Sequence, residues 1–175
     1  MNILVAYASF TGSTREVAKY IAAIQRKHRH CVHIAPIKFV NRVDEFDAII
    51  LGSPIRFGRP HQDLLSFINR YQQALLSKAT ALFIVCLTMK EDLPDNRRMV
   101  DNYLKVISDR YPDFQPLAIE YFSGTLFLDR LNFINKAFLD RSRKQRGDFR
   151  DWGRIRAWSE KLPELFVSSF AATPS

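Results

Sequence analysis

Cysteine is scarce in this chain of 175 residues, which contains two, and no apolar run approaches the length of a membrane span. Cys31 and Cys86 each lie in an apolar run, with neither a second thiol nor a histidine at metal-ligand spacing. This argues against a disulfide framework or a zinc site, and we expect two buried, reduced thiols. Because a spanning helix needs about 20 apolar residues, we expect none. The apolar start, 1–8, follows no basic segment, so we expect no secretory signal and a cytoplasmic protein.

Acidic residues are outnumbered by basic ones, 18 against 26, which gives a net charge of +8. This excess predicts an anionic partner: nucleic acid, an acidic membrane or a carboxylate-rich substrate. The sequence has no RNA-binding strand signature and no paired metal ligands, so we expect no nucleic-acid partner. His28, His30 and His33 lie where a basic helix end passes into a strand. Their rings would point to different faces, and we predict no metal site.

Short apolar runs alternate with amphipathic segments along the chain. Runs bounded by turn-forming residues predict strands at 3–8, 31–37, 48–52, 81–86 and 116–122. Apolar residues spaced by three and four predict the intervening helices and a closing helix over 152–166. This alternation implies a parallel sheet covered on both sides. We predict an α/β fold, a three-layer α/β/α sandwich with a five-stranded parallel sheet, as one domain over 1–170 with a flexible tail at 171–175.

A basic segment at about 125–150, before the last helix, does not fit this alternation. Phe127, Leu131, Ile134 and Phe138 mark an apolar helical face, and the second half of the segment is basic. The basic residues at this end are Arg141, Arg143, Lys144, Arg146 and Arg150. Such an amphipathic insertion can lie on an anionic membrane. The alternative is that its apolar face packs on the domain itself.

The loop between the first strand and the first helix is rich in hydroxyl groups. It reads Ser9, Phe10, Thr11, Gly12, Ser13, Thr14. Hydroxyls and the backbone amides of a helix N-terminus are the donors that a phosphate dianion needs, and Gly12 lets the backbone come close. The alternative is an ordinary turn with a serine N-cap. The lysine of the G-x-x-x-x-G-K-[ST] motif is missing, which disfavours a nucleoside triphosphate.

A second loop, 52–59, follows the third strand, and open parallel sheets bind ligands at such strand ends. Its glycines and proline predict a turn, and Ile55 and Phe57 offer apolar surface for a flat ring. The alternative is a tight surface turn with a buried Phe57. Arg56 and Arg59 are either solvated charges or contacts for an anionic substrate.

A third loop, which begins at Leu87, follows the fourth strand and is expected to form the other wall of the ring site. This expectation depends on its position rather than on its residue types. The residues predicted to bind the cofactor are thus Ser9, Phe10, Thr11, Gly12, Ser13, Thr14, Ser53, Pro54, Ile55, Arg56, Phe57, Gly58, Leu87, Thr88, Met89 and Lys90.

These segments carry a resemblance to known families. The S-x-T-G-S-T loop is similar to the phosphate loop of flavodoxins. Gly52 to Arg59 resembles the G-x-x-I-R-[YF]-G segment of the flavodoxin-like, menaquinone-dependent protoporphyrinogen oxidases. The resemblance continues, in the same order, at 84–90, at 123–126, in the basic insertion and at Asp151–Trp152. It covers nearly the full length.

The resemblance implies a flavodoxin-like protein that holds one FMN noncovalently, with the phosphate in the first loop. It further implies oxidation of protoporphyrinogen IX, or of another anionic small molecule, with electrons passed to a quinone. Because the flavin carries the chemistry, no catalytic side chain is expected. Arg56, Arg59 and Lys90 are the expected substrate contacts. The basic insertion would hold the protein at the inner face of the cell membrane, and pairing into a homodimer is a further option.

Three other functions stay open. The chain could be a flavodoxin-type electron carrier, although such carriers are usually acidic and the net charge here is +8. It could also be an NAD(P)H:quinone reductase. The third alternative is a flavin-free binding module that keeps the fold.

Overall fold

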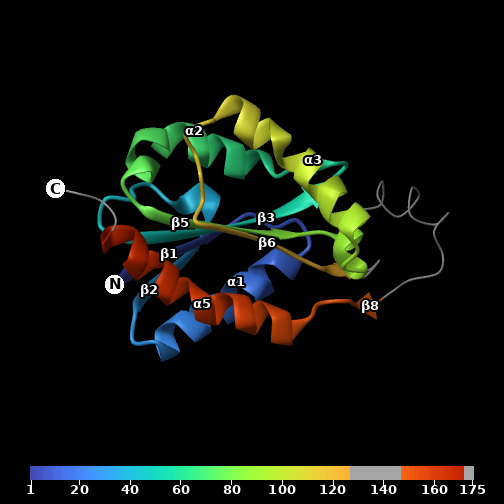
Figure 1. Ribbon diagram of the computed structural model, residues 1–175, viewed down its shortest axis with the longest axis horizontal. Helices are drawn as coiled ribbons and strands as arrows, with labels where there is room; N and C mark the ends of the chain where they lie inside the picture. The colour runs from blue at the N-terminus through green and yellow to red at the C-terminus, as the bar shows by residue number, and fades with distance from the viewer. Residues whose placement is uncertain (127–146, 172–175) are drawn as a thin grey trace.

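A computed structural model describes residues 1–126 and 147–171 of the chain. The elements, in chain order, are β1 (Asn2–Tyr7), α1 (Ser13–Lys27), β2 (Cys31–Pro36), the 3-10 turn η1 (Ile37–Phe39), β3 (Ala48–Arg56), β4 (Arg59–Pro60), α2 (Gln62–Leu76), β5 (Ala79–Val85), the 3-10 turn η2 (Leu87–Lys90), α3 (Pro94–Arg110), β6 (Ala118–Phe122), β7 (Thr125–Leu126), β8 (Gly147–Asp148) and α5 (Trp152–Ala171). Figure 1 shows α2 and α3 on one side of the sheet and α1 and α5 on the other. The predicted three-layer architecture is confirmed.

The main sheet has the strand order β2-β1-β3-β5-β6, and every neighbouring pair along this path is parallel. The central strand β3 pairs with β1 through Ala6 and Leu51, and with β5 through Leu51 and Leu82. β4 adds a short antiparallel strand to β3. The carboxyl ends of the parallel strands therefore open at one edge of the molecule.

The strands read as continuous apolar runs because the sheet is buried on both faces. In β1, Leu4 points into the layer that α2 and α3 cover, while its neighbours Ile3 and Val5 point into the layer under α1 and α5. All three side chains are fully buried. The period-2 alternation of a strand thus divides one apolar run between two cores.

The structure differs from the prediction at the end of β3. The segment 52–59, predicted as a turn, is mostly strand: β3 continues to Arg56, and the chain turns back at Phe57 and Gly58 into β4. Both turn residues have positive φ, 51° and 70°, as a two-residue hairpin turn requires. Pro54 lies within β3 rather than in the turn.

Gly52 is needed for packing rather than for a turn. It lies in β3 directly opposite Phe83 of β5. A Cβ atom at this position would lie 2.1 Å from Phe83 Cζ, far inside van der Waals contact. The missing side chain therefore makes room for a buried phenylalanine from the neighbouring strand.

The C-terminal part of the chain also differs from the prediction. α5 continues past the predicted end at Phe166 to Ala171, the first residue of the predicted tail, with Pro163 inside the helix. The short antiparallel pair of β7 and β8 joins the two ends of the predicted insertion. The apolar face predicted within the insertion, Phe127 to Phe138, and the basic residues 141–146 lie outside the described residues.

The prediction that both cysteines are buried is half wrong. Cys86 is buried, but Cys31 is exposed. Cys31 begins β2, which pairs only with β1 in the main sheet and therefore forms one of its edges. An apolar neighbourhood in the sequence cannot tell an edge strand from a central one.

Two kinds of feature are absent from the described ranges, 1–126 and 147–171. No helix in them is long and apolar enough to cross a membrane. They also hold no cluster of three histidine, cysteine, aspartate or glutamate side chains that could bind a metal ion.

Replacing Gly52 by alanine tests the close packing of β3 on β5. We expect Gly52→Ala to lower the free energy of unfolding by at least about 2 kcal/mol, because Phe83 must leave its place in the core. The measurement is urea unfolding followed by circular dichroism. Gly147→Ala is the control, since its Cβ would meet Phe149 at an ordinary 3.5 Å. A wild-type midpoint for Gly52→Ala would contradict the proposed packing.

Candidate functional site

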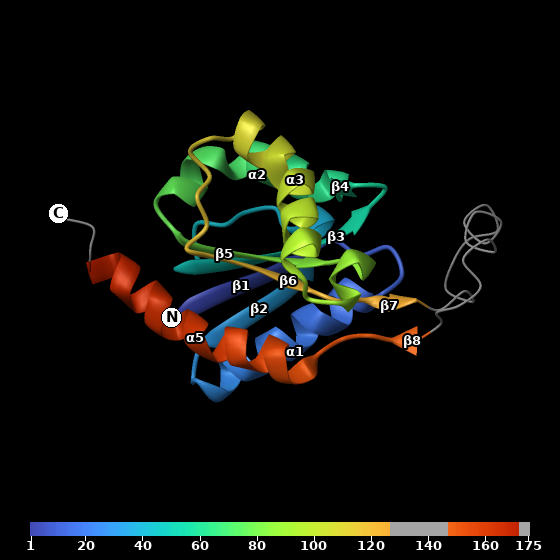
Figure 2. The same ribbon diagram turned by 45° about the vertical axis from the view of Figure 1, so that its right-hand side comes forward.

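The three loops predicted to form the site leave neighbouring strands. β1, β3 and β5 are adjacent in the sheet, so the loops that follow them begin side by side. The amide of Ala8 donates to the carbonyl oxygen of Gly52 at 2.9 Å, which extends the pairing to the start of the loops. Figure 2 shows the β3–β4 hairpin, β7 and β8 at the same end of the molecule. The sheet therefore brings the predicted segments together.

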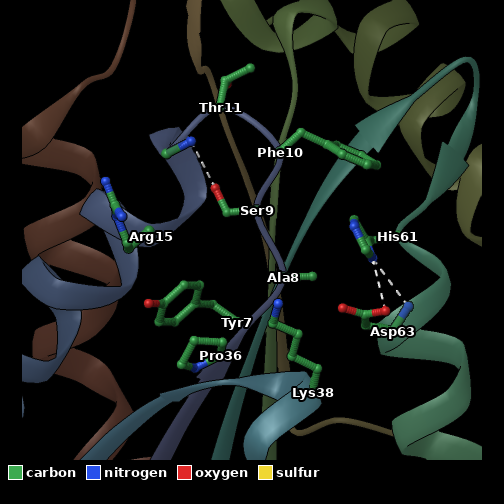
Figure 3. Close-up of a pocket in the computed structure, with 11 residues that line it drawn as sticks. Tyr7, Ala8, Ser9, Phe10, Thr11, Arg15, Pro36, Lys38, His61 and Asp63 are labelled. Carbon is green, nitrogen blue, oxygen red and sulfur yellow. Dashed lines mark hydrogen bonds and ion pairs between the residues drawn. The ribbon is translucent and has the colours of Figure 1, made fainter. Parts of the chain in front are cut away.

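The first loop forms a compact turn at the N-terminus of α1. Gly12 is the N-cap residue and has a φ of 95°, a left-handed conformation that favours glycine. Its amide donates to Ser9 Oγ at 3.0 Å (Figure 3). The first amides of a helix have no acceptor within the helix and carry its positive dipole end. The loop therefore presents several backbone donors at one place, and their binding of a phosphate stays a prediction.

The hydroxyl groups of this loop do not all serve the same purpose. Ser13 Oγ accepts a hydrogen bond from the amide of Thr125 at 3.2 Å, so it fastens the loop to β7. Gly124 lies so close that a Cβ there would be 3.4 Å from Ser13 Oγ. Ser9 Oγ is likewise used within the loop. Of the predicted phosphate ligands, the Thr11 hydroxyl and the backbone amides best match the requirement for available donors.

One residue before Gly124 the chain carries a buried hydroxyl with unused hydrogen-bonding capacity. Ser123 Oγ, at the end of β6, is buried, and nothing in the part of the chain that the structure describes forms a hydrogen bond with it. Buried polar atoms are nearly always paired, so an unpaired one points to a missing partner. The loop and the first amides of α1 fit a phosphate-bearing ligand.

The β3–β4 hairpin presents an arginine between two aromatic rings. The Arg56 guanidinium carbon lies 4.9 Å from the centre of the Phe10 ring and 5.1 Å from that of Phe57. Phe57 is 77% exposed and Phe10 is 49% exposed. The alternative of a buried Phe57 is therefore wrong. The hairpin offers stacking surface and a cation at the same place.

Ser53 has a structural task in this hairpin. Its hydroxyl accepts from the amide of His61 at 3.0 Å and donates to the carbonyl of Pro54 at 3.0 Å. Ser53 is fully buried. Its side chain thus joins β3 to the start of α2, which leaves its backbone for a ligand.

The third loop forms the 3-10 turn η2, and its side chains point to different places. Leu87 is exposed, whereas Met89 is buried in the core layer under α2 and α3. The Lys90 ammonium lies 4.8 Å from the centre of the Phe149 ring. Of the predicted contacts in this loop, Leu87 and Lys90 are at the surface, and Met89 can offer only its backbone.

Arg150 is a residue of the site region that sequence reasoning misplaced. It was counted in the basic end of the insertion that can lie on a membrane, but its side chain is only 7% exposed. It pairs with Glu16 of α1 and with Asp148, each at 2.5 Å, and lies on the Trp152 ring. These hydrogen bonds, first that to Asp148, raise the pKa of Arg150. No local pattern could have indicated a partner more than a hundred residues away.

A second ion-pair network holds the third loop to the last helix. Arg154 of α5 pairs with Asp92 at 2.5 Å and with Glu120 of β6 at 2.6 Å. Arg97 of α3 binds the same two carboxylates, at 2.7 and 3.3 Å. The hydrogen bond from Arg97 is the main cause that lowers the pKa of Asp92. The segment after η2 is thereby fixed against β6 and α5.

Comparison with known proteins agrees with this architecture. A family model described as a flavodoxin domain matches residues 4–152. The chain is 21% identical to the protoporphyrinogen IX dehydrogenase [quinone] of Escherichia coli K12, over 94% of this chain and 96% of that one. Among solved structures, it resembles oxidised flavodoxin 1 from Bacillus cereus, with a TM-score of 0.60, 18% identity, and 94% and 98% of the two chains covered. A flavodoxin from the domain Archaea gives a TM-score of 0.58 at 13% identity, with 94% and 97% covered.

The ion pairs of Asp92 predict an acid-dependent loss of stability. A carboxylate whose pKa is lower in the folded than in the unfolded state stabilises the fold above the unfolded value, near 3.9, and loses this effect as the pH falls through the folded value. Because the pairs are partly exposed, we expect Asp92→Asn to cost at most about 1 kcal/mol at pH 7. The difference from wild type should shrink below about pH 4.

The measurement is urea unfolding between pH 7 and pH 3. Asp113→Asn, which removes an exposed acid from the turn after α3, is the control and should match wild type at pH 7. A constant difference between Asp92→Asn and wild type down to pH 3 would show that the carboxylate acts through something other than its charge.

Proposed function

This chain belongs to the flavodoxin domain family, and from that premise we propose that it is an FMN-dependent oxidoreductase acting on an anionic substrate. Bound FMN supplies two-electron chemistry, accepting a hydride equivalent from a substrate and passing two electrons to an acceptor. The protein's part is to bind and orient the two molecules. No side chain has to act as a nucleophile.

The cofactor contacts that we propose divide among the three loops. The phosphate is held by the amides and hydroxyls of Ser9 to Thr14 at the N-terminus of α1, where the helix dipole favours an anion. The ring is held by the hairpin residues Ser53 to Gly58 on one side and by Leu87 to Lys90 on the other. The support for this division is that β1, β3 and β5 bring the three loops to one edge.

The observation that carries the proposal is the conformation of Phe57. A left-handed backbone costs a residue with a Cβ atom roughly 1–2 kcal/mol, and two-residue hairpins favour Asn-Gly at this place. Phe57 nevertheless has a φ of 51° and exposes 77% of its surface. Such strain is typical of functional positions. The strained conformation lowers the stability of the fold and places the Phe57 ring beside Arg56.

We propose a porphyrinogen as the substrate and a quinone as the electron acceptor. Arg56 and Arg59 lie opposite each other in the β3–β4 hairpin and Lys90 lies in η2, the two segments that we propose hold the ring, and their charges suit the carboxylates of propionate groups. In each two-electron step the porphyrinogen loses a hydride equivalent and a proton. The quinone takes up two electrons and two protons and becomes the quinol, so the step balances. The similarity to the E. coli enzyme supports this choice. Contact of the 125–150 segment with an anionic membrane, where a quinone is found, is proposed from its sequence alone.

Binding of FMN tests the proposed phosphate site. We expect Thr11→Val to raise the Kd for FMN roughly tenfold or more, because it removes a hydrogen bond to a charged group. Riboflavin lacks the phosphate, so its Kd should not change. The measurement is quenching of flavin fluorescence on titration with apoprotein. Thr80→Val, which removes a buried hydroxyl from β5, is the control. An FMN affinity unaffected by Thr11→Val would sink the phosphate assignment.

Turnover of protoporphyrinogen tests the proposed reaction. We expect flavin-loaded protein to oxidise it in the presence of a menaquinone analogue, and Arg56→Gln with Arg59→Gln to raise KM roughly tenfold through loss of carboxylate contacts. Arg70→Gln, an exposed arginine on α2, is the control. Flavin-loaded protein without any turnover would instead favour an electron carrier, a role that the similarity to solved flavodoxins also suits.

A further inference from the structure

Glu16 places a carboxylate at the N-terminus of α1, the helix end to which the proposed function assigns the phosphate. It lies in the first turn, and its amide donates to the carbonyl oxygen of Gly12 at 3.0 Å. A Cβ atom at Gly12 would lie 3.9 Å from Glu16 Oε1. An acid is stabilising at a helix N-terminus because it lies near the positive end of the dipole. For the same reason it competes there with a phosphate dianion, and the two negative charges repel each other.

Arg150, which follows β8, binds this carboxylate. Its Nη1 donates to Glu16 Oε2 at 2.5 Å, although the two residues are 134 positions apart. The Arg150 side chain is 7% exposed and that of Glu16 is 35% exposed. Salt screens a partly buried pair much less than a pair at the surface. Arg150 therefore offsets the negative charge that Glu16 brings to the loop.

The orientation of the Arg150 guanidinium is fixed by its other contacts. The Asp148 carboxylate accepts from Nε at 2.8 Å and from Nη2 at 2.5 Å, a bidentate pair that sets the plane of the group. The guanidinium carbon lies 4.5 Å from the centre of the Trp152 ring. That ring meets Tyr20 of α1 edge-on, with the centres 5.0 Å apart. These contacts hold Arg150 so that Nη1 points at Glu16.

The segment that carries Arg150 is also fastened to the first loop through the backbone. The amide of Phe149 donates to the carbonyl oxygen of Gly124 at 3.2 Å. The amide of the next residue, Thr125, donates to Ser13 Oγ at 3.2 Å. The place of Arg150 beside α1 is therefore set by backbone hydrogen bonds as well as by its ion pairs.

Arg15 also brings a cation to the loop. Its Nη2 would lie 3.4 Å from a Cβ atom at Gly12. Arg15 and Glu16 thus carry opposite charges beside the same residue, and without a partner for Glu16 these charges would cancel. Because Arg150 pairs with Glu16, the charge of Arg15 is left to attract an anion.

We propose that Arg150 is a positioning residue of the phosphate site, which acts by neutralising Glu16 and so sets the preference for a flavin that carries a phosphate. This inference rests on the proposed function, because it takes the N-terminus of α1 as the phosphate site. With Arg150 in place, the helix amides and Arg15 attract the phosphate without opposition from Glu16. Without Arg150, the carboxylate repels it.

The test is a double-mutant cycle on the full chain, with Arg150→Gln, Glu16→Gln and the variant that combines them. Each apoprotein is titrated against FMN and against riboflavin, and Kd is measured from the quenching of flavin fluorescence. We expect Arg150→Gln to raise the Kd for FMN roughly tenfold and Glu16→Gln to lower it, because the first exposes the carboxylate charge and the second removes it. The combined variant should bind FMN within about threefold of wild type, since no carboxylate is left for the arginine to neutralise. Riboflavin lacks the phosphate, so its Kd should be the same in all four proteins.

Arg156→Gln is the matched control. It breaks another arginine–glutamate pair, with Glu160 at 2.7 Å on the exposed face of α5, and should leave both Kd values unchanged. Equal losses of FMN and riboflavin affinity in Arg150→Gln would show a merely structural role and overturn the proposal. A combined variant that binds FMN as weakly as Arg150→Gln would do the same.

Glu16→Gln decides the question by itself if Arg150→Gln does not fold. A Kd for FMN that rises or stays unchanged in Glu16→Gln overturns the proposal. Wild-type protein that binds no FMN would refute the phosphate site, and with it the proposed function. Wild-type binding of FMN together with an unchanged Kd in Arg150→Gln would overturn the role of Arg150 alone.

Discussion

The parallel pairing of β3 with β1 on one side and β5 on the other is the constraint on which the proposed site depends. This pairing carries the three loops of the site to one edge of the sheet. It also requires Gly52, because Phe83 from the neighbouring strand fills the space that a side chain would take. The strand β3 thus serves both the core and the site. Its middle packs against Phe83 at Gly52, and its end leads into the hairpin that carries Phe57.

Hydroxyl groups in the first loop both build the loop and offer donors. Ser9 and Ser13 bind backbone amides, one within the loop and one on β7. Held in this way, the loop keeps its helix amides pointing outward before any ligand arrives. Such preorganisation lowers the cost of ordering the site on binding.

The basic charge of the chain has more than one role. Arg150 and Arg154 join distant elements through buried or half-buried ion pairs, so part of the excess charge holds the last helix to α1, β6 and the segment after η2. Other cations, at the hairpin, lie where a ligand could meet them. The net charge alone therefore overstates how many of the positive side chains are available to bind partners.

The sequence by itself determined the fold class, the five parallel strands and the position of the first loop. Apolar runs bounded by turn residues and helical spacing are local signals, and a chain buried on both faces of a sheet must show them. The tertiary structure alone decided that β3 continues into a hairpin, that Gly52 faces Phe83, that Cys31 lies at an exposed edge and that Met89 points into the core. It also decided the pairing of Arg150 with Glu16. Each of these depends on contacts between residues far apart in the chain, which composition and spacing do not record.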